Sequence, residues 1–125
     1  MLRPGGVLAI WAYERCRVDR ACDAIVRKIF AEVESFWPPE REIVESRYAG
    51  ITLPIPEIPA ENFAMTADWT VQQILDYMRT WSASQRFLKA NGTDPTRLHH
   101  EELAAAWGDS ARTVTWPVTL LVGRK

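Results

Sequence analysis

The feature that most constrains the fold is a tight turn followed at once by an uncharged run. Pro4-Gly5-Gly6 leads directly into Val7–Tyr13, and none of those seven residues is charged. A half-exposed antiparallel strand alternates apolar and polar residues, whereas a strand covered on both faces is continuously apolar. We therefore expect Val7–Tyr13 to be a central strand of an α/β domain, begun partway through its sheet, with one neighbouring strand missing.

Composition limits the class of protein. The 125 residues are 47% apolar, enough for one domain core, and 15 basic against 16 acidic residues give a net charge of −1. This balance predicts neither a nucleic-acid partner nor an anionic membrane partner. Cys16 and Cys22 stand six residues apart on different faces of an expected helix, so we expect free thiols. With no leader or long apolar run in sight, the expected location is cytoplasmic.

Helix signals are strong in four places. Apolar residues recur at helical spacing from Val18 to Trp37, and Pro38-Pro39 ends that helix. A short helix is expected from Glu40 to Arg47. Thr70 and Gln73 form a capping box that starts a helix at residue 71, with a break near Ser82 and an end at Asn91-Gly92. Asp94-Pro95 and Trp107-Gly108 bound another helix.

Strand signals complete the order of elements. Residues 62–69 alternate, which puts Phe63, Met65, Ala67 and Trp69 on one buried face. Residues 113–122 alternate as well, and Pro117 requires a bulge or a locally unpaired edge there. Between Gly50 and Pro59, three prolines predict an extended connection, either a mobile lid or a linker packed by its apolar side chains. We expect an α/β fold with strands at about 7–13, 62–69 and 113–122, an antiparallel final strand, and three to four helices in one partial domain, 1–125.

Three segments carry a family resemblance over essentially the whole chain. They are Leu2-Arg3-Pro4-Gly5-Gly6-Val7-Leu8, Tyr77-Met78-Arg79-Thr80-Trp81-Ser82, and Trp107-Gly108 with the later Val114-Thr115-Trp116-Pro117-Val118. Together they resemble the C-terminal portion of the class I S-adenosylmethionine-dependent methyltransferases, in the small-molecule branch that includes trans-aconitate methyltransferase. The resemblance implies a Rossmann-like sheet of seven strands, four of which precede the point where this chain begins.

The same resemblance implies a cofactor site that these residues do not contain. In the family, S-adenosylmethionine binds a Gly-x-Gly loop after the first strand and an acidic residue after the second, because glycines let the backbone approach the ligand closely. The six glycines here include no two separated by a single residue. We therefore expect no cofactor-binding residues in this chain and no methyl transfer by the chain alone.

Four residues are candidates for contact with substrate. Tyr13 stands at the carboxyl end of its strand, where ligands of open α/β sheets gather, near Trp11 and Glu14. Tyr77 and Trp81, four apart on one expected helix, offer an aromatic wall, and Arg79 could neutralise a carboxylate. The alternatives are ordinary: Trp11, Tyr13 and Trp81 as packing residues, and Arg79 as a surface ion-pair residue.

Other chemistry is weakly supported. The cluster His99-His100-Glu101-Glu102 lacks the spacing of three or four that helical metal ligands need, and solvated helix surface explains it better. No nucleophile with a neighbouring base is indicated, and methyl transfer depends chiefly on alignment of donor and acceptor. We expect no metal, and the catalytic residues stay unidentified.

Two functions follow as hypotheses. The first is the C-terminal portion of an S-adenosylmethionine-dependent methyltransferase that acts on a small molecule, with a carboxylate as the group that Arg79 would recognise. The alternative is a non-catalytic module of the same fold that mediates dimerisation or binds a partner. Because the 7–13 strand would have an unpaired edge, we expect a homodimer through this edge and neighbouring helices, or association with a separately encoded N-terminal half.

Overall fold

The computed structural model describes residues 2–125, which form two compact units. One unit comprises the residues up to Cys16, Glu40–Thr66 and Thr115–Lys125. The other comprises Arg17–Pro39 and Ala67–Val114. Strands β3 (Phe63–Trp69) and β4 (Arg112–Arg124) each continue from one unit into the other.

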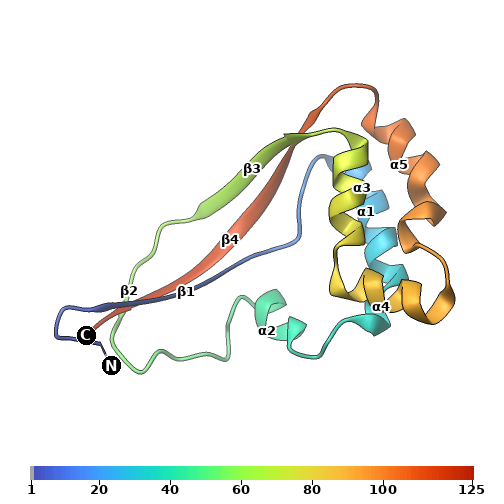
Figure 1. The fold of residues 1–125 in the computed structure, drawn as a ribbon. Helices are drawn as coiled ribbons and strands as arrows, with labels where there is room; N and C mark the ends of the chain where they lie inside the picture. Colours follow the sequence, from blue (N-terminus) through green and yellow to red (C-terminus); the bar gives the residue numbers. More distant parts are fainter. Residues whose placement is uncertain (1) are drawn as a thin grey trace. The chain divides into compact units, whose positions relative to one another are not determined.

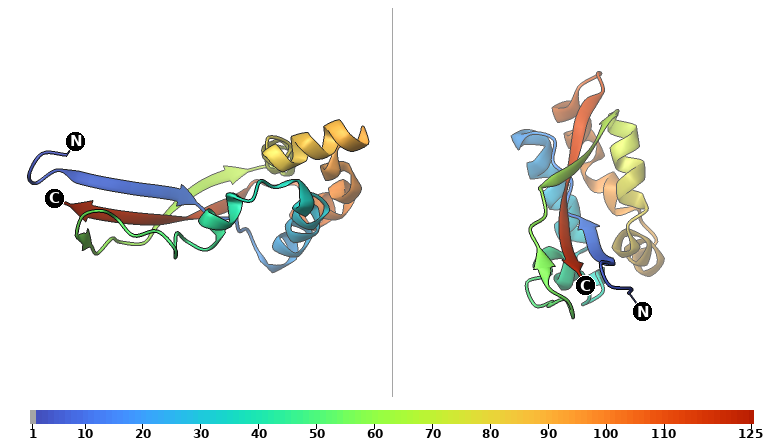
Figure 2. Two further views of the ribbon diagram at one scale, coloured as in Figure 1. Left: turned by 90° about the horizontal axis from the view of Figure 1, so that it is seen from below. Right: turned by 90° about the vertical axis from the view of Figure 1, so that its left-hand side faces the viewer.

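The sheet is organised around β4 (Figure 1). Strand β1 (Val7–Tyr13) pairs with β4 in antiparallel register, from Val7 opposite Arg124 to Tyr13 opposite Val118. The two-residue strand β2 (Glu57–Ile58) pairs with β4 on its other side, as the end-on view in Figure 2 shows, and β3 also pairs with β4. The three expected strands and the antiparallel final strand are therefore present, and β2 is an addition within the proline-rich connection.

One face of β1 is not covered. Leu8, Ile10 and Ala12 are half-buried, but Tyr13 is exposed and Trp11 is 61% exposed. The expectation that both faces of this strand are covered is wrong for this chain, because no described residue packs over the face that carries Trp11. An uncharged run indicates that both faces of a strand are suited to burial, but it does not show that this chain supplies the elements that cover them.

The proline-rich connection packs on the opposite face of the same sheet. Leu53 is buried, and a Cβ built on Gly123 would lie 2.7 Å from Ile55 Cγ1 and 3.1 Å from Leu53 Cδ1. Leu8 is the β1 neighbour of Gly123, so these contacts belong to the face that carries Leu8 rather than Trp11. The segment is thus held by side-chain packing as well as by β2.

Helix α2 (Arg41–Glu45) is tied to the end of β1 by ion pairs. Arg15 Nη2 lies 2.9 Å from Glu45 Oε1, and Arg47 Nε lies 3.0 Å from Glu14 Oε1. Thr119 on β4 also donates to Glu14, over 3.0 Å. Pro117 lies one residue beyond the β1 register and its carbonyl accepts from the Glu14 N–H, which shows how β4 tolerates a proline without a donor there.

The second unit is helical. It contains α1 (Arg20–Glu32), α3 (Val71–Arg79), α4 (Ser82–Asn91) and α5 (His100–Trp107), with short 3₁₀ helices η1 (Glu34–Phe36) and η2 (Pro95–His99). Its core consists of buried apolar side chains from these helices and from the start of β4: Cys22, Ile25, Val26, Ile29, Phe30, Val33, Ile74, Leu75, Met78, Ala83, Leu103, Trp107 and Val114.

The helix expected over Val18–Trp37 ends at Glu32, before Pro38-Pro39, and a separate 3₁₀ turn follows it. The helix expected between Asp94-Pro95 and Trp107-Gly108 is divided into η2 and α5. Other expected boundaries are confirmed. Asp19 caps α1, Thr70 and Gln73 form the capping box of α3, and Gly92 ends α4 with φ +69°. The break before Ser82 is also present. The buried face expected for β3 is partly wrong, because Phe63 is 52% and Met65 40% exposed, while Trp69 is half-buried.

Candidate substrate-binding site

An aromatic cluster occupies one side of the helical unit. The ring centroid of Tyr77 lies 5.5 Å from that of Trp69 and 5.9 Å from that of Trp81, and Trp37 lies 5.7 Å from Trp81. Phe30 stacks on Trp37 at 5.4 Å. All but Phe30 are only half-buried, so the cluster presents aromatic surface to a ligand as well as to the core.

The structure brings Tyr77 and Trp81 together as expected, but through two helices. Helix α3 ends at Arg79, and Trp81 is the N-cap residue of α4 with extended backbone, φ −58° and ψ 136°. The two rings meet edge to face at an interplanar angle of 86°. The turn between the helices therefore positions the Trp81 ring, and the expectation of a single helical face is corrected.

Arg79 lies on a different face of α3 from Tyr77, because two residues along a helix rotate the side chain by about 200°. Its Nε donates to Asp94 Oδ2 over 2.6 Å, and its Nη1 donates to Asp76 Oδ1 over 2.6 Å. These two carboxylates fix the guanidinium and neutralise its charge. Arg79 is therefore not part of the aromatic wall.

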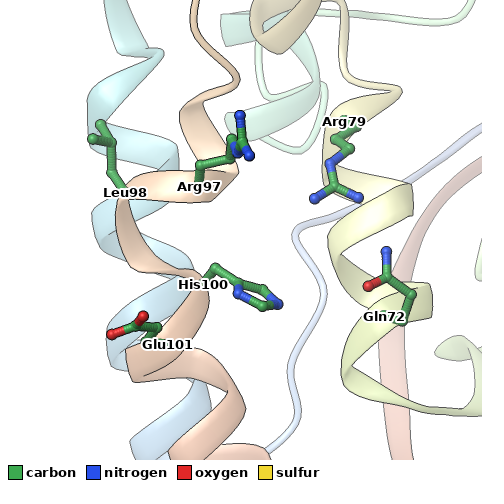
Figure 3. Close-up of a pocket in the computed structure, with 6 residues that line it drawn as sticks. All are labelled: Gln72, Arg79, Arg97, Leu98, His100 and Glu101. Atoms are coloured by element: carbon green, nitrogen blue, oxygen red, sulfur yellow. The ribbon is translucent and has the colours of Figure 1, made fainter.

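Arg79 instead lines a separate polar pocket of about 420 Å³ (Figure 3). The side chains of Gln72, Arg79, Arg97 and His100 face the space between α3 and the η2–α5 segment, whereas Glu101 and Leu98 lie toward its outer side. Gln72 also donates to Asp76 over 2.8 Å. Among residues 2–125, no ion pair is seen for Arg97, so its charge is available to a ligand anion.

The ion pairs of this pocket shift two pKa values. The hydrogen bond to Asp94 raises the pKa of Arg79, since it stabilises the charged guanidinium more than burial disfavours it. Burial would raise the pKa of Asp94, but hydrogen bonds from Arg79 and Thr96 outweigh it and hold that pKa below its ordinary value. Both groups are charged at neutral pH.

Tyr13, the fourth candidate, belongs to the other unit. It is exposed at the end of β1, opposite Val118 of β4. Trp11 is exposed two residues earlier, and Glu14 is held by Arg47 and Thr119. Tyr13 and Trp11 are therefore not core residues of this chain. Glu14 has a structural role, because it holds Arg47 at the end of α2.

Sequence reasoning missed Trp69, Arg97, His100 and Gln72. A signal existed for Gln72, because Gln72, Asp76 and Arg79 follow helical spacing along one face of α3. The sequence pattern suggests only metal binding or solvated helix surface for His99 and His100. The structure separates them: His99 lies 3.5 Å from Glu32 and 3.6 Å from Glu102, while His100 faces the pocket. Across residues 2–125, no group of three side chains could hold a metal ion.

The cysteines and the helices add two further findings. Both cysteines are buried and neither forms a disulfide, and burial raises the pKa of the Cys22 thiol to about 11, with Asp19 adding to the effect. Cys22 therefore does not offer a reactive nucleophile at neutral pH. Within the described part of the chain, no helix has the length and apolar character needed to cross a membrane.

The proteins similar to this chain include a curated protein and a solved structure. A protein of Dictyostelium discoideum named "Putative methyltransferase" is 26% identical over 134 residues, which cover 100% of this chain and 51% of that protein. A solved structure described as "The Structure of a Putative Type II Methyltransferase from Anaeromyxobacter dehalogenans" is 38% identical, with a TM-score of 0.90, and the match covers 98% of this chain and 53% of that one. No protein-family profile matches.

These similarities support a methyltransferase and confirm the mixed α/β fold as part of a methyltransferase fold. The chain spans about half the length of each of these two relatives.

Proposed function

We propose that this chain is the C-terminal, substrate-side portion of an S-adenosylmethionine-dependent methyltransferase that acts on a small carboxylate-bearing molecule. The observation that carries the proposal is the match of 98% of the chain to one methyltransferase structure at 38% identity. The small-molecule branch that includes trans-aconitate methyltransferase is the narrower proposal, and it rests on the three sequence segments described above.

The helical unit offers two complementary surfaces for such a substrate. The half-buried rings of Trp69, Tyr77 and Trp81 suit an apolar or planar portion, and the Tyr77 hydroxyl provides a polar group. In the pocket, two carboxylates hold Arg79 in place, and Arg97 supplies the charge that a substrate carboxylate would neutralise. Arg79 then lines the pocket and helps to orient the substrate.

The described residues do not fit S-adenosylmethionine itself. No two glycines are spaced for a Gly-x-Gly loop, and the positive-φ glycines Gly5, Gly92 and Gly108 stand singly. The chain's own contribution is to bind and orient the methyl acceptor, which is the chief requirement of a transfer that depends on alignment. The cofactor would be held by polypeptide equivalent to the other half of the relatives.

The cofactor part of the proposal is tested by calorimetric titration of the chain with S-adenosylmethionine. We expect no specific binding. A dissociation constant of about 10 μM or tighter, roughly 7 kcal/mol, would place the cofactor on residues assigned here to packing and would contradict this part of the proposal.

The substrate part is tested with a chimera that joins the unmatched part of the Anaeromyxobacter chain to this chain. Labelled methyl transfer is measured on a panel of small carboxylic acids and their neutral amides. We expect transfer to an acid, with a KM raised about tenfold to a hundredfold by Arg97→Gln and unchanged by Lys89→Gln, which removes an exposed charge elsewhere. Equal use of acids and amides would contradict a carboxylate substrate.

A non-catalytic association module is the second candidate, favoured by the exposed face of β1. The chimera separates the two functions. A folded chimera that binds S-adenosylmethionine but transfers no methyl group to any substrate, acid or amide, favours the module.

A further inference from the structure

In the first unit, one face of the sheet formed by β1 and β4 exposes apolar side chains. Antiparallel register places the side chains of Ala9 and Val122 next to each other, and likewise Trp11 with Leu120 and Tyr13 with Val118. Ile58 of β2 lies beside Val122 on the same face. We call this set the bare face.

The bare face is apolar and open to solvent. Trp11, Tyr13 and Ile58 are exposed, and their β4 neighbours Leu120, Val118 and Val122 are only half-buried. Val7, which is also exposed, lies opposite the exposed Arg124 at the end of this face. A monomeric protein rarely exposes a contiguous apolar patch of more than a few hundred Å² unless the patch binds something. The opposite face of the same strands is packed by Leu53 and Ile55, so only one side of this sheet lacks a cover.

The edge of β1 is open as well. Strand order β1-β4-β2 leaves β1 with one neighbour among residues 2–125. Natural sheets protect such edges with charges, prolines or bulges. Val7–Tyr13 contains no charge and no proline, and it pairs with β4 without interruption from Val7 to Tyr13. An edge of this kind is suited to pair with a further strand.

We propose that the bare face and the β1 edge bind a polypeptide equivalent to the remaining half of the relatives, through an apolar helix on the face and a strand at the edge. The inference rests on the proposed function. It is argued from length: each relative continues for about as many residues again outside the matched region. The Anaeromyxobacter protein keeps the matched half in nearly this conformation, at a TM-score of 0.90, in a chain of which the match covers 53%. A second copy of this chain is the competing occupant.

The test uses the full chain co-expressed with the unmatched part of the Anaeromyxobacter chain as a separate polypeptide. We expect a 1:1 complex by sedimentation equilibrium, weakened at least about thirtyfold by Trp11→Lys, the usual effect of losing a central interface side chain. The matched control is Ile43→Lys, because Ile43 is 45% exposed on α2 in the same unit but outside the bare face. This control should bind like the wild type.

Three outcomes would overturn the inference. A self-dimer that Trp11→Lys dissociates would assign the face to a second copy, and absence of any complex would show that the other half does not bind it. A complex that survives Trp11→Lys would place the contact elsewhere. Because the readout is association, a complex that forms but transfers no methyl group would leave this inference standing and contradict only the proposed function.

Discussion

Arg79 Nε donates to Asp94 Oδ2 over 2.6 Å and so joins the last turn of α3 to the first residue before η2. The other oxygen of Asp94 accepts from the backbone N–H of Thr96 over 2.9 Å and from its hydroxyl over 2.8 Å. One carboxylate thus caps η2 and holds the side chain of Arg79, which lines the pocket of Figure 3.

The first prediction concerns the pH dependence of stability at Asp94. Its pKa is lower in the native state than the ordinary value near 3.9, because hydrogen bonds from Arg79 and Thr96 outweigh the effect of burial. The unfolded chain therefore binds the proton more readily. The ionised Asp94 carboxylate therefore contributes to the free energy of unfolding above about pH 4, and this contribution is lost as pH falls through the native pKa.

Asp94→Asn removes that contribution. Urea midpoints of the variant and the wild type should differ at pH 6 and converge toward pH 2.5. Asp19, whose pKa is also lowered, chiefly by the backbone hydrogen bond from Cys22, is present in both proteins and cancels in the difference. A difference that stays constant over this range would contradict the assignment.

A second prediction concerns the start of α3. The Thr70 hydroxyl accepts from the Gln73 N–H, and Gln73 Oε1 accepts from the Thr70 N–H over 2.8 Å. Thr70→Ala removes one half of this capping box and should lower the free energy of unfolding by about 1 kcal/mol in urea denaturation. Thr93→Ala, the same change at an exposed position with no side-chain hydrogen bond among the described residues, should have little effect. Equal effects would show that the cap does not stabilise the helix.

A third prediction concerns the proline-rich connection. Gly123→Ala would place its Cβ 2.7 Å from Ile55 Cγ1, so the connection must shift, at a cost of about 1 to 3 kcal/mol. Hydrogen exchange over residues 50–59 should become faster. Gly50→Ala meets no atom within 4 Å at an ordinary backbone angle and is the control. Unchanged exchange in Gly123→Ala would mean that packing against β4 does not hold this segment.

A fourth prediction concerns the Cys22 thiol. It is fully buried, and burial raises its pKa to about 11, so little thiolate exists at pH 8. In a Cys16→Ser background, labelling by a thiol reagent at pH 8 should wait for unfolding and should accelerate with urea as the unfolded population grows. Labelling in native buffer at the rate of a free cysteine would contradict this.

Much of the helical unit was predictable because its boundaries depend on local chemistry. A capping hydroxyl at Thr70, a proline after Asp94 and a glycine at residue 92 act on the backbone within three or four residues, and each boundary falls where those residues place it. The apolar stripe of α1 is equally local, since helical periodicity alone selects the buried side.

The candidate site was predictable only in part. Helical spacing paired Tyr77 with Trp81, although in the structure the turn between α3 and α4 brings the two rings together. Trp69 on β3 and Arg97 on η2 were not found, because their neighbours come from other elements of the unit. The partners of Arg79 were missed for the same reason, since Asp94 is fifteen residues away.

By itself, the sequence determined which segments form strands and helices, several of the helix caps, and that Val7–Tyr13 is a strand suited to burial, because these depend on spacing and on short-range hydrogen bonds. Only the tertiary structure decided which face of that strand is packed, that Glu57–Ile58 joins β4, and that Arg79 meets two aspartates instead of the aromatic cluster. These features depend on contacts between residues distant in the chain, and periodicity carries no information about which distant surface will cover a given side chain.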